Sequence, residues 1–170
     1  MPARYPKNRE CWCEQLNSGD PGAFAGDPIC QHGDEECKGN AIEACAISQA
    51  GSSAKAWPFL LCYEGANRGS PDALNACATD AGLDALAIKD CSDGDAARSL
   101  LEDAARATCA LDPPHQYVPW PMVAGEHVCG SSVRAWDQGA DDDDGGFDCD
   151  LTAIVCEAYT GSDPPPACRR

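Results

Sequence analysis

Residues 30–45 read CQHGDEECKGNAIEAC, so three cysteines, a histidine and an asparagine fall within sixteen positions. From Asp34 onward the pattern is helical, because small and apolar residues recur at steps of three and four positions and share one helix face. These residues are Cys37, Ala41, Ala44 and Cys45. Asp34 is the predicted N-cap, since a short acidic side chain is favoured at that position.

The pairing of these cysteines is limited by helix geometry. Cys37 and Cys45 are eight residues apart, which is about 12 Å along a helix that rises 1.5 Å per residue, and a disulfide needs Cα atoms within about 7 Å. The two therefore cannot bond to each other. Cys30, in the turn before the helix, can close on Cys37, and Cys45 is then left to reach another element, such as the one that carries Cys62.

A zinc site is the alternative for the same stretch, because mixtures of cysteine and histidine are common zinc ligands. Its ligands would be Cys30, His32, Cys37 and Cys45. Tetrahedral zinc sites usually use cysteines with two to four residues between them, whereas six residues separate Cys30 from Cys37. We therefore predict no metal, and we interpret His32 as a hydrogen-bonding residue of the turn.

The cysteine content indicates an oxidising compartment. The chain has 13 cysteines in 170 residues, a density typical of disulfide-built proteins and unusual for the reducing cytosol. Because 13 is odd, at least one thiol is expected to be free or bonded to a partner outside this chain. The first residues, MPARYPKNRE, lack the apolar segment of a secretory signal, so we expect that the true N-terminus precedes this sequence.

Charge and hydropathy exclude two classes of partner. The chain has 28 acidic and 12 basic residues and a net charge of −16, with no basic stripe, so we expect no nucleic acid partner. No segment approaches the roughly 18 apolar residues of a membrane-spanning helix. The acidic run at 141–144 fails the calcium-loop pattern, because Thr152 stands where a glutamate is required.

Local patterns divide the rest of the chain. Residues 1–29 are rich in turn-forming residues and predict an irregular segment. Helices are expected at about 71–78, 82–90 and 94–108. The segment QYVPWPMVAG, residues 116–125, predicts a strand, and an acidic, glycine-rich loop follows at about 126–149.

The last predicted helix has the clearest signals. Asp150 is its expected N-cap and Gly161 lies just past its end. Its apolar face consists of Leu151, Ile154, Val155 and Ala158. The tail DPPPAC after it is expected to be held only if Cys168 is bridged.

The order Cys-Gln-His-Gly, two residues, Glu-Cys, two residues, Asn, four residues, Cys at 30–45 resembles the signature of the gamma-interferon-inducible lysosomal thiol reductase family. Two further segments are similar to segments of that family, LDPPHQYVPW at 111–120 and IVCEAYTG at 154–161. The three matches occur in the family's order and cover most of the chain from Cys30 onward.

The resemblance implies an α/β, thioredoxin-like fold with a disulfide-rich helical insertion, over a domain of residues 30–168. It also implies a thiol-disulfide oxidoreductase that reduces protein disulfides in an acidic lysosomal lumen or after secretion. Small thiols would be its reductants, and no organic cofactor would be needed. Val118 and Pro119 would form a substrate-binding loop with a cis X-Pro bond, which turns the Val118 backbone toward an extended peptide.

The sequence departs from the family at the catalytic centre. The family uses a C-x-x-C upstream of the signature, and these 170 residues contain no C-x-x-C. The nearest substitute is CWC, with Cys11 and Cys13, but no apolar strand precedes it and no helix follows it to lower a thiol pKa. We therefore expect a chain that lacks the first strand and the catalytic helix and has little or no reductase activity.

The resemblance also implies which cysteines form disulfides. Eight of them lie in segments similar to cysteine-bearing segments of the family and can all be bridged: Cys30, Cys37, Cys45, Cys62, Cys77, Cys91, Cys156 and Cys168. Cys129 and Cys149 flank the acidic insertion and are expected to close it. Cys109 is then the expected odd thiol. Two alternatives stay open, a non-catalytic, disulfide-stapled module that binds peptides and a small zinc protein.

Overall fold

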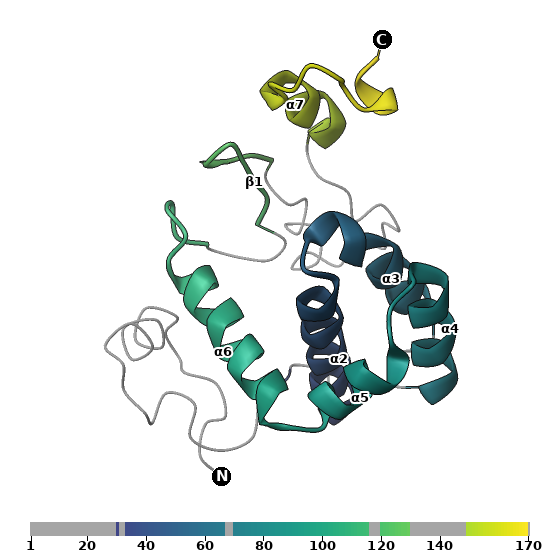
Figure 1. The fold of residues 1–170 in the computed structure, drawn as a ribbon. Helices are drawn as coiled ribbons and strands as arrows, with labels where there is room; N and C mark the ends of the chain where they lie inside the picture. The colour runs from purple at the N-terminus through teal and green to yellow at the C-terminus, as the bar shows by residue number, and fades with distance from the viewer. Residues whose placement is uncertain (1–29, 31–32, 67–69, 116–119, 130–148, 170) are drawn as a thin grey trace, which may run out of the picture. The chain divides into compact units, whose positions relative to one another are not determined.

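A computed structural model describes residues 30, 33–66, 70–115, 120–129 and 149–169 (Figure 1). The chain divides into two compact units, Met1–Cys109 and Ala110–Arg170. The described residues are mostly helical, with six α-helices, one short 3-10 helix and a two-stranded sheet. The predicted domain boundary at residues 29 and 30 falls at the edge of the described residues and stays a prediction.

The helix predicted by the opening stretch is α2, Asp34–Ala50. The prediction of Asp34 as its N-cap is wrong: the cap is Gly33, and no side chain caps the helix. Gly33 has φ 94°, a backbone region that glycine reaches without the steric cost of a Cβ atom. Asp34 is instead the first of three acidic residues in the first turn, where negative charge favours the helix dipole.

Helix α3, Ser53–Gly65, was not predicted from the sequence. It contains Pro58, a residue that normally breaks a helix interior, and its apolar residues do not form a single stripe. The sequence did contain one starting signal: the Ser52 side chain accepts a hydrogen bond from the backbone N–H of Lys55 at 3.4 Å. Packing against the core stabilises this helix despite the proline.

Three further helices complete the first unit, and all three were predicted. They are α4, Pro71–Ala81, α5, Ala85–Ser92, and α6, Asp95–Cys109. The start of α5 is fixed by Asp84, whose side chain accepts hydrogen bonds from the backbone N–H groups of Leu86 and Ala87. The predicted start near residue 82 was too early, because Gly82 ends α4 instead.

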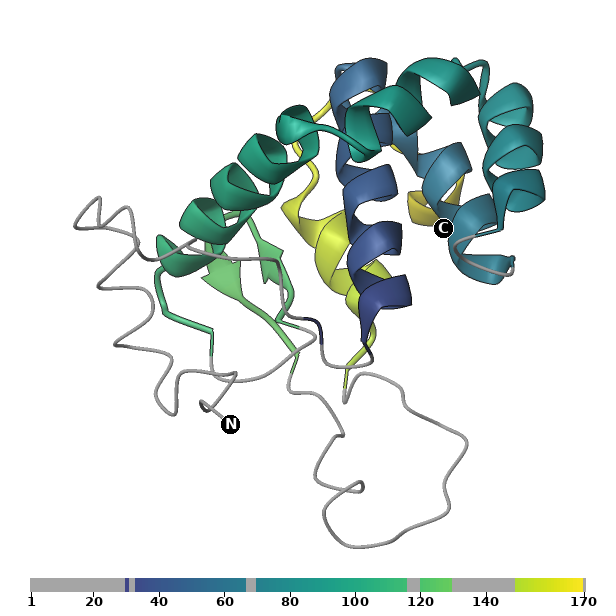
Figure 2. The ribbon, with the colours of Figure 1, turned by 90° about the horizontal axis from the view of Figure 1, so that it is seen from below.

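Helix α2 forms the centre of the first unit, in contact with α3, α5 and α6 (Figure 1). Helices α3 and α4 lie side by side, as the second view also shows (Figure 2). The core between them is centred on Phe59 and Tyr63, both 0% exposed, whose rings stack with centroids 5.3 Å apart. Around this pair lie Ala41, Cys45, Ala46, Leu74, Cys77, Ala78, Ile88 and Ala97.

The end of α4 gives a direct test of local backbone geometry. Gly82 has φ 69°, its N–H bonds to the carbonyls of Ala78 and Thr79, and the Leu83 N–H reaches Ala78 at 2.8 Å, a Schellman motif. We expect Gly82→Ala to lower the free energy of unfolding by about 1 kcal/mol. A Cβ at this position would meet no neighbouring atom, so the cost is that of the backbone conformation alone.

The measurement is chemical unfolding followed by far-ultraviolet circular dichroism. Gly65→Ala is the matched control, since Gly65 lies at the end of α3, without a positive φ and with open space at its Cβ position. Equal losses in the two variants would show that the left-handed conformation of residue 82 does not matter.

In the second unit, β1, Met122–Val123, pairs antiparallel with β2, Glu126–His127. The two-residue turn between them, Ala124-Gly125, has φ 53° and 89°, the positive values of a type I′ hairpin turn. Strand β1 lies in the predicted strand segment. Strand β2 lies in the segment that was predicted to be an acidic loop, so an ordered hairpin occupies its beginning.

The second unit ends with α7, Leu151–Ala158, and η3, Pro166–Cys168. The predicted cap is confirmed, because the Asp150 side chain accepts a hydrogen bond from the Ala153 N–H at 2.9 Å. The predicted apolar face, however, contains no buried residue among the described ones, and Val155 is 44% exposed. The described residues thus give a helical first unit and a smaller second unit, and the thioredoxin-like fold stays a prediction.

None of the helices described here combines the length and the apolar character needed to cross a membrane.

Candidate functional site

The signature stretch folds into a compact turn at the start of α2. The Gly33 N–H donates to the carbonyl of Cys30 at 3.2 Å, and the Cys37 N–H donates to the carbonyl of Gly33 at 3.4 Å. These two bonds bring Cys30 back over the first helical turn. The Cα atoms of Cys30 and Cys37 are 5.5 Å apart, and the two residues form a disulfide.

Asn40 joins this turn from one helical turn further on. Its side-chain amide donates a hydrogen bond to Sγ of Cys30 at 3.8 Å. Because residues three positions apart share a helix face, the spacing of Cys37 and Asn40 places both side chains over the incoming Cys30. The sequence showed the asparagine as a fixed position of the signature but gave no role for it.

Charge at this turn is dominated by acids. Asp34, Glu35 and Glu36 all lie in the first turn of α2. The Nζ of Lys38 donates to Glu35 at 2.6 Å, and this hydrogen bond, with the negative charge of Glu35, raises the pKa of Lys38. The lysine therefore stays protonated and offsets one of the three carboxylates.

Cys45, the third cysteine of the stretch, has a different role. It is 2% exposed and forms a disulfide with Cys91, which connects α2 to α5. The expected partner Cys62 is instead bonded to Cys77 and connects α3 to α4. The prediction was wrong because α2 packs against α5, a packing relation that residue spacing does not reveal.

The remaining described cysteines are also bonded. Cys129 pairs with Cys149 and Cys156 with Cys168. Cys109 is disulfide-bonded too, so its prediction as the odd thiol is wrong. Because the other ten described cysteines are bonded to one another, the partner of Cys109 lies outside the described residues.

These bridges contradict the zinc alternative. A zinc ligand must be a thiolate, whereas the sulfurs of Cys30, Cys37 and Cys45 are each bonded to another sulfur. Within the described ranges no group of three or more histidine, cysteine or acidic side chains is arranged to hold a metal.

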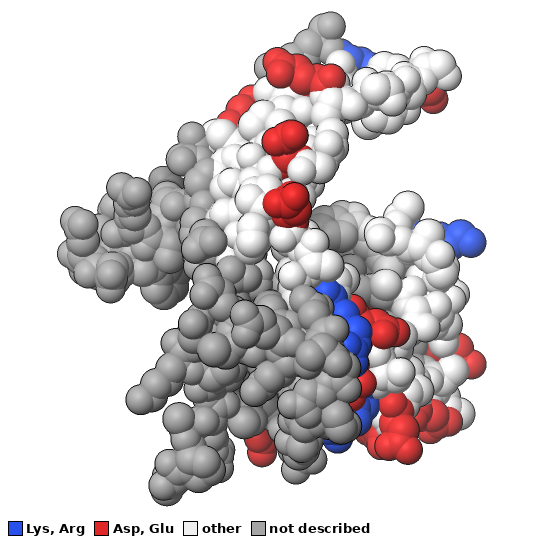
Figure 3. Space-filling model, turned by 90° about the vertical axis from the view of Figure 1, so that its left-hand side faces the viewer, with Lys and Arg blue, Asp and Glu red and all other residues white. Residues whose placement is uncertain are grey.

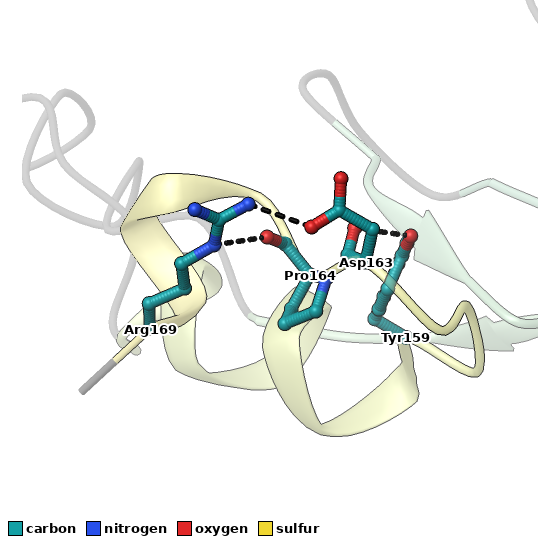
Figure 4. Close-up of polar contacts among 4 residues, drawn as sticks. All are labelled: Tyr159, Asp163, Pro164 and Arg169. Atoms are coloured by element: carbon teal, nitrogen blue, oxygen red, sulfur yellow. Dashed lines mark hydrogen bonds and ion pairs between the residues drawn. The ribbon is translucent and has the colours of Figure 1, made fainter.

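The C-terminal motif IVCEAYTG is held by its own contacts (Figure 4). The hydroxyl of Tyr159 donates to the carbonyl of Asp163 at 2.8 Å, and Arg169 bonds to the Asp163 carboxylate and to the Pro164 carbonyl. A Cβ at position 161 would overlap the ring and hydroxyl of Tyr159, which explains the glycine. Together with the bridge to Cys168, these contacts fix the tail.

Several predicted site residues lie outside the described part of the chain. These are Cys11, Cys13, His32, Val118 and Pro119. The described residue next to the predicted cis-proline loop is Trp120, whose ring stacks on that of His127 in β2 with centroids 3.6 Å apart. The sequence gave no signal for this pairing, because it depends on the hairpin turn that brings the two residues together.

A pocket in the first unit is too small for a peptide. Its volume is about 130 Å³, below the several hundred Å³ typical of ligand sites. It is lined by Lys38, Ile42, Ser70, Pro71, Leu74, Lys89, Ser92 and Asp93. Both lysines are in ion pairs, Lys38 with Glu35 of its own helix and Lys89 with Asp93, the C-cap of α5. On the face drawn in Figure 3, some of the basic side chains form a short band beside acidic ones, and others stand apart from it.

Comparison with known proteins addresses the family directly. Residues 17–81 match the family model described as gamma interferon inducible lysosomal thiol reductase. A protein of Arabidopsis thaliana named gamma-interferon-responsive lysosomal thiol protein is 36% identical over 137 residues, which cover 81% of this chain. The chain belongs to the gamma-interferon-inducible lysosomal thiol reductase family.

Matches to animal relatives cover nearly the same share of this chain. Proteins named gamma-interferon-inducible lysosomal thiol reductase from Carassius auratus and Mus musculus are 36% and 29% identical, and each match covers 82% of this chain. The matched region is 51%, 50% and 49% of the plant, fish and mouse proteins. The chain thus spans about half the length of the curated relatives that it matches.

Proposed function

We propose that this protein is a thiol-disulfide oxidoreductase that reduces disulfides of protein substrates in an acidic, lysosomal or secreted setting, with small thiols as reductants. The observation that carries this proposal is the signature stretch 30–45 in a family whose relatives are named thiol reductases. The thioredoxin-like fold, with α2–α6 as the disulfide-rich helical insertion, is part of the same proposal. Val118 and Pro119 are proposed to bind the substrate peptide.

Reduction of a disulfide needs a thiolate that attacks one sulfur and a second thiol that resolves the mixed disulfide. All eleven cysteines within the described residues are already in disulfides, so this part of the chain holds no resting thiolate. We propose that the described helices act as a scaffold and that the nucleophile is a C-x-x-C that these 170 residues do not contain.

The purified 170-residue chain is therefore expected to show little reductase activity. The measurement is the rate at which a fluorescent, disulfide-linked peptide is cleaved at acidic and neutral pH with excess cysteine. We expect a rate no more than about twofold above that of cysteine alone, because an attacking thiolate is the first requirement of the reaction. Multiple turnovers per chain would contradict the proposed scaffold role.

Sequencing the natural transcript on the 5′ side of the Met1 codon tests the other half of the proposal. An encoded C-x-x-C after an apolar strand is the expected result. A longer product with that motif should cleave the same peptide, and serine at its first cysteine should abolish cleavage. A transcript without such a motif would overturn the reductase proposal for this protein.

A non-catalytic, disulfide-stapled module that binds peptides is the second candidate, favoured by the fully bonded state of the described cysteines. It predicts that the 170-residue chain binds extended peptides without cleaving them. Fluorescence anisotropy of a labelled peptide would measure this, with Pro119→Ala expected to weaken binding and Pro164→Ala, in the C-terminal tail, expected to leave it unchanged. Absence of binding in the parent chain would reject this candidate.

A further inference from the structure

The five bridges between described cysteines differ in how they are built into the fold. Cys45–Cys91 and Cys62–Cys77 each contain one sulfur-bearing residue that is almost fully buried, with Cys45 2% and Cys77 1% exposed. Both bridges also connect separate helices. Attack by a thiol requires access to a sulfur, so in these two bridges the core protects Cys45 and Cys77 and leaves only Cys91 and Cys62 partly exposed.

In the bridge between Cys30 and Cys37 both residues are partly exposed, as they are in Cys129–Cys149 and Cys156–Cys168. Cys30 and Cys37 have the shortest separation of the three pairs, seven positions within one local turn. Opening the bridge separates no pair of helices, since α2 keeps its contacts with α3, α5 and α6 through other residues. This bridge can therefore open with little loss of packing.

Asn40 makes the two sulfurs of the bridge different as leaving groups. When a thiolate attacks a disulfide, one sulfur forms the new bond and the other leaves with the electron pair, and a better-stabilised leaving thiolate speeds the reaction. The Asn40 amide already donates to Sγ of Cys30 at 3.8 Å, and a hydrogen bond to a charged acceptor is stronger than one to a neutral acceptor. Cys30 is thus the favoured leaving group and Cys37 the favoured point of attack.

We propose that Cys30–Cys37 is a thiol-exchange site, at which a small neutral or cationic thiol forms a mixed disulfide with Cys37 and releases Cys30. A bond forms between the sulfur of the small thiol and Sγ of Cys37, the Cys30–Cys37 bond breaks, and the Cys30 thiolate takes a proton from solvent. A second small thiol then regenerates the Cys37 thiol and leaves as the small-molecule disulfide. Two thiols are oxidised and one bridge is reduced.

The preference for neutral or cationic thiols comes from the acidic first turn. Asp34 and Glu35 lie in the same first turn of α2, and Lys38 pairs with Glu35. The negative charge of Asp34 repels anionic thiols and attracts cationic ones, an effect that salt weakens. The site therefore distinguishes thiols of the same reactivity by charge.

The inference does not depend on the proposed reductase function, because each chain opens its Cys30–Cys37 bridge only once and no substrate is turned over. The intact 170-residue chain is incubated with cysteamine, quenched with N-ethylmaleimide and analysed by peptide mass spectrometry. After a short incubation, before the second thiol has reacted, we expect Cys30 to carry maleimide and Cys37 to carry cysteamine, at least about tenfold faster than any modification of the Cys45–Cys91 and Cys62–Cys77 pairs. Equal rates, or cysteamine on Cys30, would overturn the proposal.

Variants of Asn40 test the leaving-group role. Asn40→Ala is expected to slow the opening by about three- to tenfold, since it removes a hydrogen bond to a developing charge, and Asn40→Asp is expected to slow it further by repulsion. Asn75→Ala, on the exposed surface of α4, is the matched control and should leave the rate unchanged. An Asn40→Ala rate equal to that of the parent, with α2 intact by circular dichroism, would refute the role of Asn40.

The charge preference is measured by replacing cysteamine with thioglycolate at the same thiolate concentration. We expect cysteamine to react several times faster at low salt and the difference to shrink at high salt. Equal rates at low salt would refute this part of the proposal. Reductase assays of the chain do not bear on these results, so failure here and failure of the proposed function can be told apart.

Discussion

Phe59→Ala is expected to lower the free energy of unfolding of the helical unit by about 3–5 kcal/mol, the cost of removing a large aromatic side chain from a packed core. Phe59 is 0% exposed and stacks on Tyr63, which is equally buried. The ring lies on α3, between the other helices of the core cluster. Its loss would leave a cavity that Tyr63 cannot fill without losing its own contacts.

The measurement is guanidinium unfolding of the oxidised chain, followed by circular dichroism at 222 nm. Trp57→Ala is the matched control, because Trp57 lies on the same helix and is 58% exposed; its expected cost is under about 1 kcal/mol. Phe59→Leu should fall between the two, at about 1.5 kcal/mol or less. Similar losses at positions 57 and 59 would show that the core is not centred on this aromatic pair.

The sequence predicted elements where periodicity and caps agree. Asp150 was predicted as an acidic cap, and its side chain accepts the expected backbone hydrogen bond. Asp84 caps α5 in the same way, although that helix was predicted to start near residue 82. Helix α3 was missed because Pro58 breaks the local rule and only tertiary packing restores the helix. Helix periodicity and residue spacing report on one segment at a time, and α3 depends on its neighbours.

The candidate site shows the same division. The local bridge between Cys30 and Cys37 follows from the spacing of a turn before a helix. The bridge from Cys45 to Cys91 spans 46 positions and depends on the packing of α2 against α5, so residue spacing pointed to Cys62 instead. The hydrogen bond from Asn40 to Cys30 needed the structure as well, because it depends on how far the turn folds back.

The second large effect is expected from removing the bridge between Cys45 and Cys91. A disulfide stabilises a fold mainly by restricting the unfolded chain, and the restriction grows with the length of the closed loop. For a separation of 46 residues the chain-entropy relation gives about 4 kcal/mol, and for the separation of 7 between Cys30 and Cys37 it gives about 2 kcal/mol.

The double variant Cys45→Ala with Cys91→Ala should therefore lose about 4 kcal/mol of unfolding free energy in the same guanidinium experiment. The matched double variant Cys30→Ala with Cys37→Ala should lose about half as much. Each double variant removes both cysteines of one bridge, so neither creates an additional unpaired thiol that could form a wrong bridge.

The ratio of the two losses is the informative quantity, because errors in the extrapolation to zero denaturant affect both variants alike. A larger loss for the long bridge means that α2 and α5 are held together by a constraint on the unfolded chain as well as by their core residues. Equal losses would mean that the buried contacts of Ile88 and Ala46 keep these helices together without the bridge. In that case the third cysteine of the signature would need a role other than stability.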